Sequence, residues 1–102
     1  MNNQTKRTSK DIIEILKRHQ KDLSARFKVK EIGVFGSYIR GEQKEKSDVD
    51  VLVEFEEPVS LLWVVKVENY LTELLGKKVD LIPKRDVRPE LKEQILKEAV
   101  YL

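Results

Sequence analysis

Two aspartates, Asp48 and Asp50, are the residues in this chain best suited to chemistry. Side chains along a strand alternate between faces, so residues two apart point the same way with about 6.6 Å between them. The valines at 49, 51 and 53 take the other face, where they can pack. Carboxylates held this close repel each other, which indicates a bound cation. Because Mg2+ binds carboxylates together with phosphate oxygens, often as two ions about 3.5–4 Å apart, the pair predicts a phosphoryl-transfer site.

A second candidate feature lies upstream, where the short apolar segment 30–35 ends at Gly36 and Ser37. A buried strand that stops at Gly-Ser and continues as Tyr-Ile-Arg predicts a tight turn that opens a short helix. In such a turn, backbone N–H groups and the Ser37 hydroxyl can converge on an anion without an intervening side chain. The turn is therefore predicted to hold a triphosphate.

Arg40 closes this short helix and has two interpretations. Its guanidinium can add a phosphate contact to the turn. A helix-end arginine packed against Glu42 or Asp48 explains the residue equally well. Its assignment to the nucleotide site is therefore provisional.

A third carboxylate is predicted to join the pair from a neighbouring strand. Residues 76–82 read Gly-Lys-Lys-Val-Asp-Leu-Ile, a short strand with Asp80 on one face. If this strand runs beside the one that carries Asp50, Asp80 reaches the same cluster from the adjacent rung. Alone, Asp80 could be a surface strand residue or a helix cap, but the three acids together support one shared site.

The elements that position these residues are expected in the order helix, strand, short helix, strand, helix, strand, helix. Thr8, with Asp11 in a capping-box position, starts the first helix, and Ser60 and Gly76 bound the third. The apolar stripe of the first helix is expected at Ile12, Leu16, Leu23 and Phe27. That of the third is expected at Leu61, Leu62, Val65, Leu71, Leu74 and Leu75. The last helix begins at Pro89, and its buried face is expected at Leu91, Ile95, Leu96, Ala99 and Val100.

The connections between these elements predict the sheet. The crossover from the Asp50 strand to the Asp80 strand makes the two parallel, whereas the short connection after Phe35 favours an antiparallel first strand. A small mixed three-stranded sheet backed by helices follows, which is an α+β fold. Residues 8–102 are expected to form one domain, and the polar residues 1–7 a disordered tail.

Three further side chains that could do chemistry are assigned to packing. His19 falls on the apolar stripe of the first helix, where a histidine at the edge of the core is the simpler explanation. Trp63 and Tyr70 lie on the third helix. They are expected to face the core or a partner, because a platform for adenine should lie near the strand ends.

Composition excludes several classes of protein. Twenty basic residues against eighteen acidic ones leave a net charge of +2, which argues against a dedicated nucleic-acid groove. The absence of cysteine removes disulfides and thiolate metal sites and fits a reducing cytoplasm. The longest apolar run, Leu61 to Val65, is far too short to span a membrane. A cytoplasmic protein is therefore expected.

The motifs together resemble the minimal nucleotidyltransferases, the smallest members of the DNA polymerase β-like superfamily. The resemblance covers nearly the whole chain and is carried by Gly36-Ser37, Arg40-Gly41, Ser47-Asp48-Val49-Asp50, Lys78-Val79-Asp80-Leu81 and the ending 95–102. It implies a nucleotidyltransferase fold and transfer of a nucleoside monophosphate, usually from ATP, with release of pyrophosphate. Many such proteins resemble the antitoxin partner of a HEPN-domain ribonuclease toxin, and in some modules the antitoxin adenylylates a tyrosine of the toxin.

The resemblance also implies a role for each residue. Asp48 and Asp50 would hold Mg2+ against the triphosphate, and Asp80 would complete a second metal site. Gly36 and Ser37 would hold the β and γ phosphates. Since 102 residues leave little room for a second lobe, the acceptor is expected to be a protein surface.

Two alternatives remain open. The chain could be a non-catalytic antitoxin that inhibits a ribonuclease by occlusion, although occlusion does not require three clustered acids. A small-molecule acceptor, such as an aminoglycoside, is less favoured because it would need a homodimeric cleft.

Overall fold

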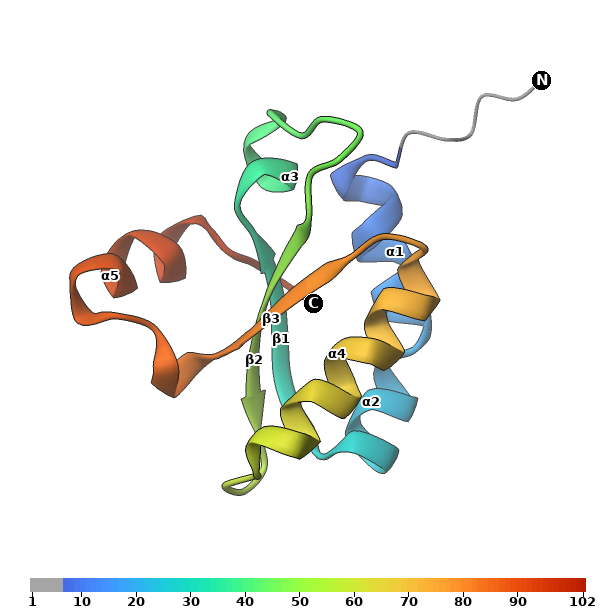
Figure 1. The fold of residues 1–102 in the computed structure, drawn as a ribbon, viewed down its shortest axis with the longest axis vertical. Coiled ribbons are helices and arrows are strands. Elements are labelled where there is room, and N and C mark those ends of the chain that lie inside the picture. Colours follow the sequence, from blue (N-terminus) through green and yellow to red (C-terminus); the bar gives the residue numbers. More distant parts are fainter. Residues whose placement is uncertain (1–6) are drawn as a thin grey trace.

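The computed structural model describes residues 7–102, which form three layers (Figure 1). The elements in chain order are α1 (Ser9–Arg18), α2 (Gln20–Phe27), β1 (Val29–Phe35), α3 (Ser37–Arg40), β2 (Val49–Phe55), α4 (Leu61–Leu75), β3 (Val79–Pro83), the 3-10 turn η1 (Lys84–Asp86), α5 (Pro89–Glu98) and β4 (Val100–Tyr101). α5 lies on one side of the sheet, and α1, α2 and α4 lie on the other. Apart from Arg7, the expected N-terminal tail is outside the described residues. None of the helices in 7–102 has the length and apolar character to cross a membrane.

The sheet has four strands in the order β3-β2-β1-β4. β2 and β3 are parallel and β1 is antiparallel to β2, as the connections predict. The prediction of three strands is wrong, because Val100 and Tyr101 leave the last helix and pair with Val34 and Gly33 of β1. Gly33 makes room for this pairing, since a Cβ there would lie 2.9 Å from the Tyr101 ring. The pairing gives the backbone of β1 a second neighbour.

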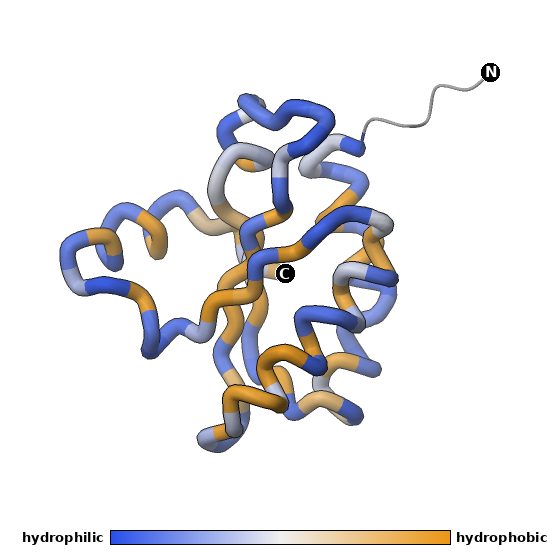
Figure 2. Tube along the Cα trace, viewed as in Figure 1, coloured by the Kyte–Doolittle hydropathy of each residue, from blue (hydrophilic) through white to orange (hydrophobic). Residues whose placement is uncertain are grey.

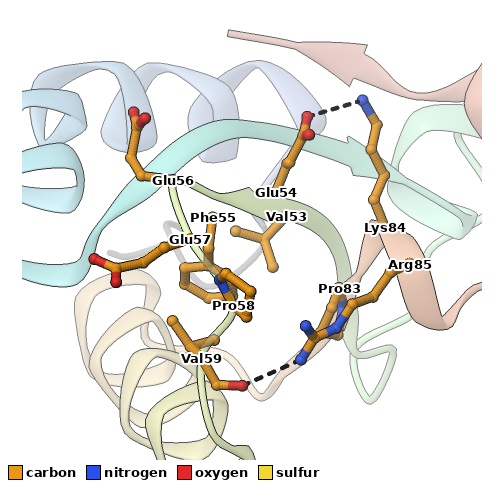
Figure 3. A pocket seen from close by; sticks show the side chains of 10 residues that line it. All are labelled: Val53, Glu54, Phe55, Glu56, Glu57, Pro58, Val59, Pro83, Lys84 and Arg85. Atoms are coloured by element: carbon orange, nitrogen blue, oxygen red, sulfur yellow. Dashed lines mark hydrogen bonds and ion pairs between the residues drawn. The ribbon is translucent and has the colours of Figure 1, made fainter.

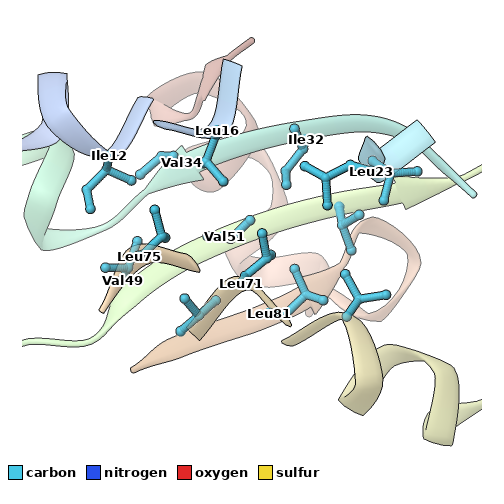
Figure 4. Close-up of a cluster of buried hydrophobic side chains, with 14 of the residues drawn as sticks. Ile12, Leu16, Leu23, Ile32, Val34, Val49, Val51, Leu71, Leu75 and Leu81 are labelled. Atoms are coloured by element: carbon cyan, nitrogen blue, oxygen red, sulfur yellow. The ribbon is translucent and has the colours of Figure 1, made fainter. Parts of the chain in front are cut away.

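The main core lies between the sheet and the helices α1, α2 and α4 (Figure 4). Val49, Val51 and Val53 of β2 are all buried there, which confirms the predicted register of this strand. Apolar residues follow the strands through the middle of the molecule in Figure 2. The opposite face of the sheet carries Asp50 and a smaller cluster under α5.

The segment expected to form a single first helix forms two helices, α1 and α2. The capping box of Thr8 and Asp11 is confirmed, with the Asp11 N–H donating to Thr8 Oγ1 at 3.2 Å. The helix breaks at His19, whose Nδ1 is hydrogen-bonded to the Ile15 carbonyl at 2.9 Å. The break leaves the whole expected stripe buried: Ile12, Leu16, Leu23 and Phe27.

Trp63 and Tyr70 pack at the edge of the core, as predicted. Their ring centroids lie 6.2 Å and 4.7 Å from that of Phe27. Trp63 Nε1–H also donates to the Phe27 carbonyl at 2.9 Å. These aromatic side chains therefore join α4 to α2.

The predicted buried face of α4 is partly wrong. Leu61 and Leu62 are 78% and 81% exposed, and Val65 is 41% exposed. The buried residues of this helix are Val64, Val67, Leu71 and Leu75. Apolar residues occupy almost every direction around the first turn of α4, so the pattern there does not determine which side faces the sheet.

The expected face of α5 is also only partly correct. Ile95, Leu96 and Ala99 pack against the smaller cluster of Phe35, Leu52 and Val87. Leu91 is 44% exposed, and Val100 belongs to β4 and is 39% exposed. α5 therefore covers only part of its face of the sheet.

Side chains of α4 cover the outer edge of β3. The Val79 N–H donates to Thr72 Oγ1 at 3.1 Å, and the Leu81 N–H donates to Glu68 Oε2 at 2.9 Å. β3 has no further strand beside it in the described sheet, so these two donors would otherwise face outward unpaired. The next outward position is Pro83, which has no N–H.

Candidate active site

Asp50 and Asp80 are neighbours on adjacent parallel strands. They are register partners in β2 and β3, as are Val49 and Val79 one residue earlier. Both valines are buried in the main core, so both aspartates project from the opposite face of the sheet. Adjacent strands are about 4.8 Å apart, which places the two carboxylates close together. The structure thus brings Asp80 beside Asp50, while the metal-binding role of both stays a prediction.

Asp48 lies just before β2 and adds a third carboxylate at this end of the sheet. Asp48 and Asp80 are exposed, whereas Asp50 is partly buried. Burial, followed by the negative charges of Asp80 and Asp48, raises the pKa of Asp50 to about 6. The positive charge of Arg40 opposes this shift. The surroundings of Asp50 therefore disfavour its charged form.

These residues suit a hard divalent cation. Within residues 7–102, no three His, Cys, Asp or Glu side chains converge closely enough to form a ready-made metal site. A cation beside Asp50 would nevertheless stabilise its charged form, which burial and the neighbouring carboxylates disfavour. Carboxylate oxygens are the protein ligands that Mg2+ takes, with substrate phosphates in the remaining positions. The chemistry of these carboxylates thus suits Mg2+ that binds together with a polyphosphate, and their role as its ligands stays a prediction.

Gly36 forms the predicted tight turn between β1 and α3. Its φ of 82° and ψ of −153° lie in a region that is essentially restricted to glycine. A Cβ at this position would overlap Oδ2 of Asp50 and lie 2.9 Å from its Cγ. The Asp50 carboxylate therefore lies directly against the backbone of the turn. The N–H groups of Ile39 and Arg40 donate to the Gly36 carbonyl at 3.0 and 3.1 Å, which starts the short helix α3 at Ser37.

Arg40 is held by two carboxylates. Its Nε donates to Glu42 Oε1 at 2.9 Å, which is one of the two predicted partners. Its Nη1 donates to Glu98 Oε1, also at 2.9 Å. The sequence-based alternative of packing against Glu42 is thus present, and a contact with phosphate is untested.

Glu98 was not predicted as a site residue. Its Oε2 accepts the Gly36 N–H at 2.7 Å while its Oε1 accepts from Arg40. Glu98 ends α5, and only Ala99 separates it from the two-residue strand β4. A strand this short has no periodicity to detect, so the sequence contains no signal that brings Glu98 to the turn.

A cavity of about 270 Å³ at the other end of β2 contains none of the predicted site residues (Figure 3). It is lined by residues 53–59 and 83–85. Lys84 Nζ lies 3.6 Å from Glu54 Oε1, and Arg85 Nη2 donates to the Val59 carbonyl at 3.1 Å across it. These contacts pair its cations with neighbouring groups, and the predicted site residues Asp48 and Asp50 lie at the opposite end of β2.

In the absence of metal, Asp50→Asn is expected to stabilise the fold at pH 8. Since the pKa of Asp50 is raised from 3.8 to about 6, ionisation of this side chain disfavours the folded state, and asparagine avoids that effect. Solvent screening at this partly exposed position reduces the gain to about 1 kcal/mol. The gain should decrease as the pH falls through 6 and vanish below 3.8, where the aspartate is protonated in both states. Thermal unfolding in EDTA at several pH values measures it, and an equal gain at pH 3.5 and 8 would contradict the assignment.

Comparisons with known proteins agree with this geometry. The family model of the nucleotidyltransferase domain matches residues 16–102. The protein adenylyltransferase MntA of Thermococcus cleftensis is 52% identical over 93% of this chain and 96% of its own length. A solved structure assigned as a minimal nucleotidyltransferase superposes with a TM-score of 0.73 at 40% identity, covering 89% of this chain and 95% of that one. The chain belongs to the nucleotidyltransferase family, among its minimal members.

Solved complexes also contain domains of this fold. A chain from a toxin–antitoxin complex with AMP-PNP has a TM-score of 0.67 at 26% identity, covering 88% of this chain and 68% of that one. A chain from the complex of tri-AMPylated Shewanella oneidensis HEPN toxin with MNT antitoxin has a TM-score of 0.60 and covers 90% of this chain and 66% of that one. At 23% identity, the second likeness shows the fold alone. By its relatives, this chain is a nucleotidyltransferase of the protein adenylyltransferase class.

Proposed function

We propose that this chain transfers AMP from ATP to a tyrosine hydroxyl of a HEPN-domain toxin and thereby acts as its antitoxin. The observation that carries the proposal is the register pairing of Asp50 with Asp80 beside the Gly36 turn. The pairing supports the proposal because carboxylates that could hold a cation lie next to a backbone turn that could receive phosphates. The sequence relatives named as protein adenylyltransferases and the complex that contains AMP-PNP support the choice of donor and reaction.

The turn and its helix would bind the polyphosphate tail. Gly36 and Ser37 would hold the β and γ phosphates, with the Ser37 hydroxyl and backbone N–H as donors. Because Gly36 has no side chain, the Asp50 carboxylate can lie against the turn beside them. Arg40 would add a charged contact through the N–H groups that Glu42 and Glu98 leave unused. These contacts orient the α phosphoryl group toward the acceptor.

Asp48, Asp50 and Asp80 would hold Mg2+, in a two-ion arrangement with Asp80 in the second site. When bound, Mg2+ supplies neutralisation of the charge that develops on the transferred group. The partly buried Asp50 would be ionised in that state, because a nearby cation lowers its pKa.

The reaction exchanges one phosphorus–oxygen bond for another. The tyrosine oxygen bonds to the α phosphorus while the bond from the α phosphorus to the bridging oxygen of the β phosphate breaks, and pyrophosphate leaves. Asp80 would accept the hydroxyl proton as the oxygen attacks. Catalysis therefore depends mainly on positioning and electrostatics.

Label transfer tests the proposal. The purified chain is incubated with Mg2+, ATP labelled at the α phosphate and a purified HEPN-domain protein as the candidate acceptor, and covalent label is located by mass spectrometry. The expected result is AMP on a toxin tyrosine, lost when that tyrosine is replaced by phenylalanine, together with loss of ribonuclease activity.

The same experiment tests the alternative of inhibition by occlusion. Occlusion predicts that the ribonuclease is inhibited without ATP and that no label is transferred. Labelling of the toxin that leaves its ribonuclease activity intact would support the enzyme but contradict its role as an antitoxin.

A further inference from the structure

We propose that Glu98 is a positioning residue that holds the Gly36 turn and Arg40 in the arrangement that receives the triphosphate. The inference rests on the proposed function and assigns it a further residue, located at the end of α5 rather than in any of the motifs around the acids. It also gives α5 and β4 a part in the reaction.

Both oxygens of the Glu98 carboxylate are used. Oε2 accepts the Gly36 N–H at 2.7 Å and Oε1 accepts from Arg40 Nη1 at 2.9 Å. The Glu98 side chain is only 17% exposed. Burial alone would raise its pKa, but the hydrogen bonds from Gly36 and Arg40 outweigh burial and hold the pKa below its ordinary value. The side chain is therefore a charged, two-point link between the C-terminal segment and the turn.

The pairing of β4 explains why Glu98 reaches this point. Val100 is the register partner of Val34 in an antiparallel pair. Because the pair is antiparallel, the same register brings Gly36, two residues after Val34, opposite Glu98, two residues before Val100. The close approach of Tyr101 to Gly33 fixes that register, since a Cβ at Gly33 would clash with the ring.

The contacts of Glu98 indicate that it positions the Gly36 turn and Arg40 and does not compete with phosphate for their N–H groups. Gly36 has a backbone conformation that other residues avoid, and the Glu98 hydrogen bond fixes the amide that begins the turn. Arginine has five N–H donors, of which Glu98 and Glu42 use one each, so donors remain for a phosphate. Without Glu98, Arg40 would keep only Glu42, whose side chain is 64% exposed.

The kinetic test compares Glu98→Ala, Glu98→Gln and the control Glu93→Ala at an exposed position of the same helix. Glu98→Ala is expected to raise the KM for ATP about tenfold with a smaller change in kcat, because ground-state phosphate contacts are lost. Glutamine has one acceptor oxygen in place of two, so Glu98→Gln should recover part of the affinity, with a KM raised about threefold. Glu93→Ala should match the wild type.

Three outcomes would overturn the proposal. An unchanged KM in Glu98→Ala would show that the link is dispensable, and a lowered KM would show that Glu98 competes with the nucleotide. A loss of kcat and stability without the KM effect, and without partial recovery by glutamine, would reduce Glu98 to a structural role. If the wild type shows no thermal shift with Mg2+ and ATP, the proposed function fails first and the role of Glu98 fails with it.

A measurement on the folded wild type covers the case in which Glu98→Ala does not fold. The Gly36 N–H donates to Glu98 Oε2 with an N-to-O distance of 2.7 Å. Its proton resonance should therefore lie downfield and remain there when Mg2+ and ATP are added. An upfield movement on nucleotide binding would show that Glu98 leaves the turn, which contradicts positioning.

Discussion

Asp50→Asn is expected to reduce adenylyl transfer about a thousandfold or more, because the substitution removes the central carboxylate of the proposed metal site. Asp50 is flanked by Asp80 on the adjacent strand and lies against the Gly36 backbone. Asparagine keeps the shape of the side chain but cannot offer a negative charge. The initial rate of label transfer to the toxin measures the effect.

Stability separates this loss of activity from unfolding. The variant is expected to be at least as stable as the wild type at pH 8 without metal, because asparagine carries no charge to be disfavoured by burial and by the neighbouring Asp80 and Asp48, the causes that raise the Asp50 pKa. Mg2+ and ATP at one hundred times their dissociation constant should stabilise the wild type by about 2.7 kcal/mol. Asp50→Asn should lose most of that gain.

Asp86→Asn is the matched control, since Asp86 is an exposed aspartate in η1 that belongs to a different part of the surface. Its transfer rate and its response to Mg2+ and ATP should equal those of the wild type. If Asp50→Asn keeps more than a tenth of the wild-type rate, or responds to Mg2+ and ATP as strongly, Asp50 is not a metal ligand.

The largest effect on stability is expected for Gly36→Ala. Alanine would have to adopt a φ of 82° with ψ of −153°, and its Cβ would overlap the Asp50 carboxylate. Backbone strain and the displacement of Asp50 together should destabilise the fold by about 3 kcal/mol. Urea unfolding followed by circular dichroism measures the change. Adenylyl transfer should fall in the fraction that remains folded, because the turn and Asp50 move together.

Gly41→Ala provides the control for positive φ alone. Gly41 has a φ of 73° and a ψ of 23°, but a Cβ there would meet nothing within 4 Å. Gly41→Ala should therefore destabilise the fold by about 1 kcal/mol, the ordinary penalty for a residue with a Cβ in the left-handed helical region. If Gly36→Ala and Gly41→Ala destabilise the fold equally, the contact between Gly36 and Asp50 contributes nothing to stability.

The acids and the turn could be predicted because their signals are local. Alternation along β2 places Asp50 opposite the buried valines, and a glycine between a strand and a short helix specifies a turn. The crossover rule then predicts that the Asp80 strand runs parallel to the Asp50 strand, which the structure confirms.

The missed features depend on tertiary contacts. β4 has two residues, and its position follows from the space above Gly33 rather than from its own sequence. Glu98 reaches Gly36 only through that pairing. The prediction of which side of α4 faces the sheet is wrong at the first turn, where Leu61 and Leu62 are apolar but exposed. Apolar residues surround that turn in almost every direction, so only the tertiary contacts decide which of them is buried.

The hydrogen bonds along the outer edge of β3 limit how another chain can bind there. Thr72 and Glu68 accept the amide hydrogens of Val79 and Leu81, and Pro83 has none to offer. An incoming extended peptide would find every outward amide donor of β3 already engaged or missing. Strand addition along this margin is therefore blocked, both for a binding protein and for self-templated aggregation, so specificity there has to come from side-chain complementarity.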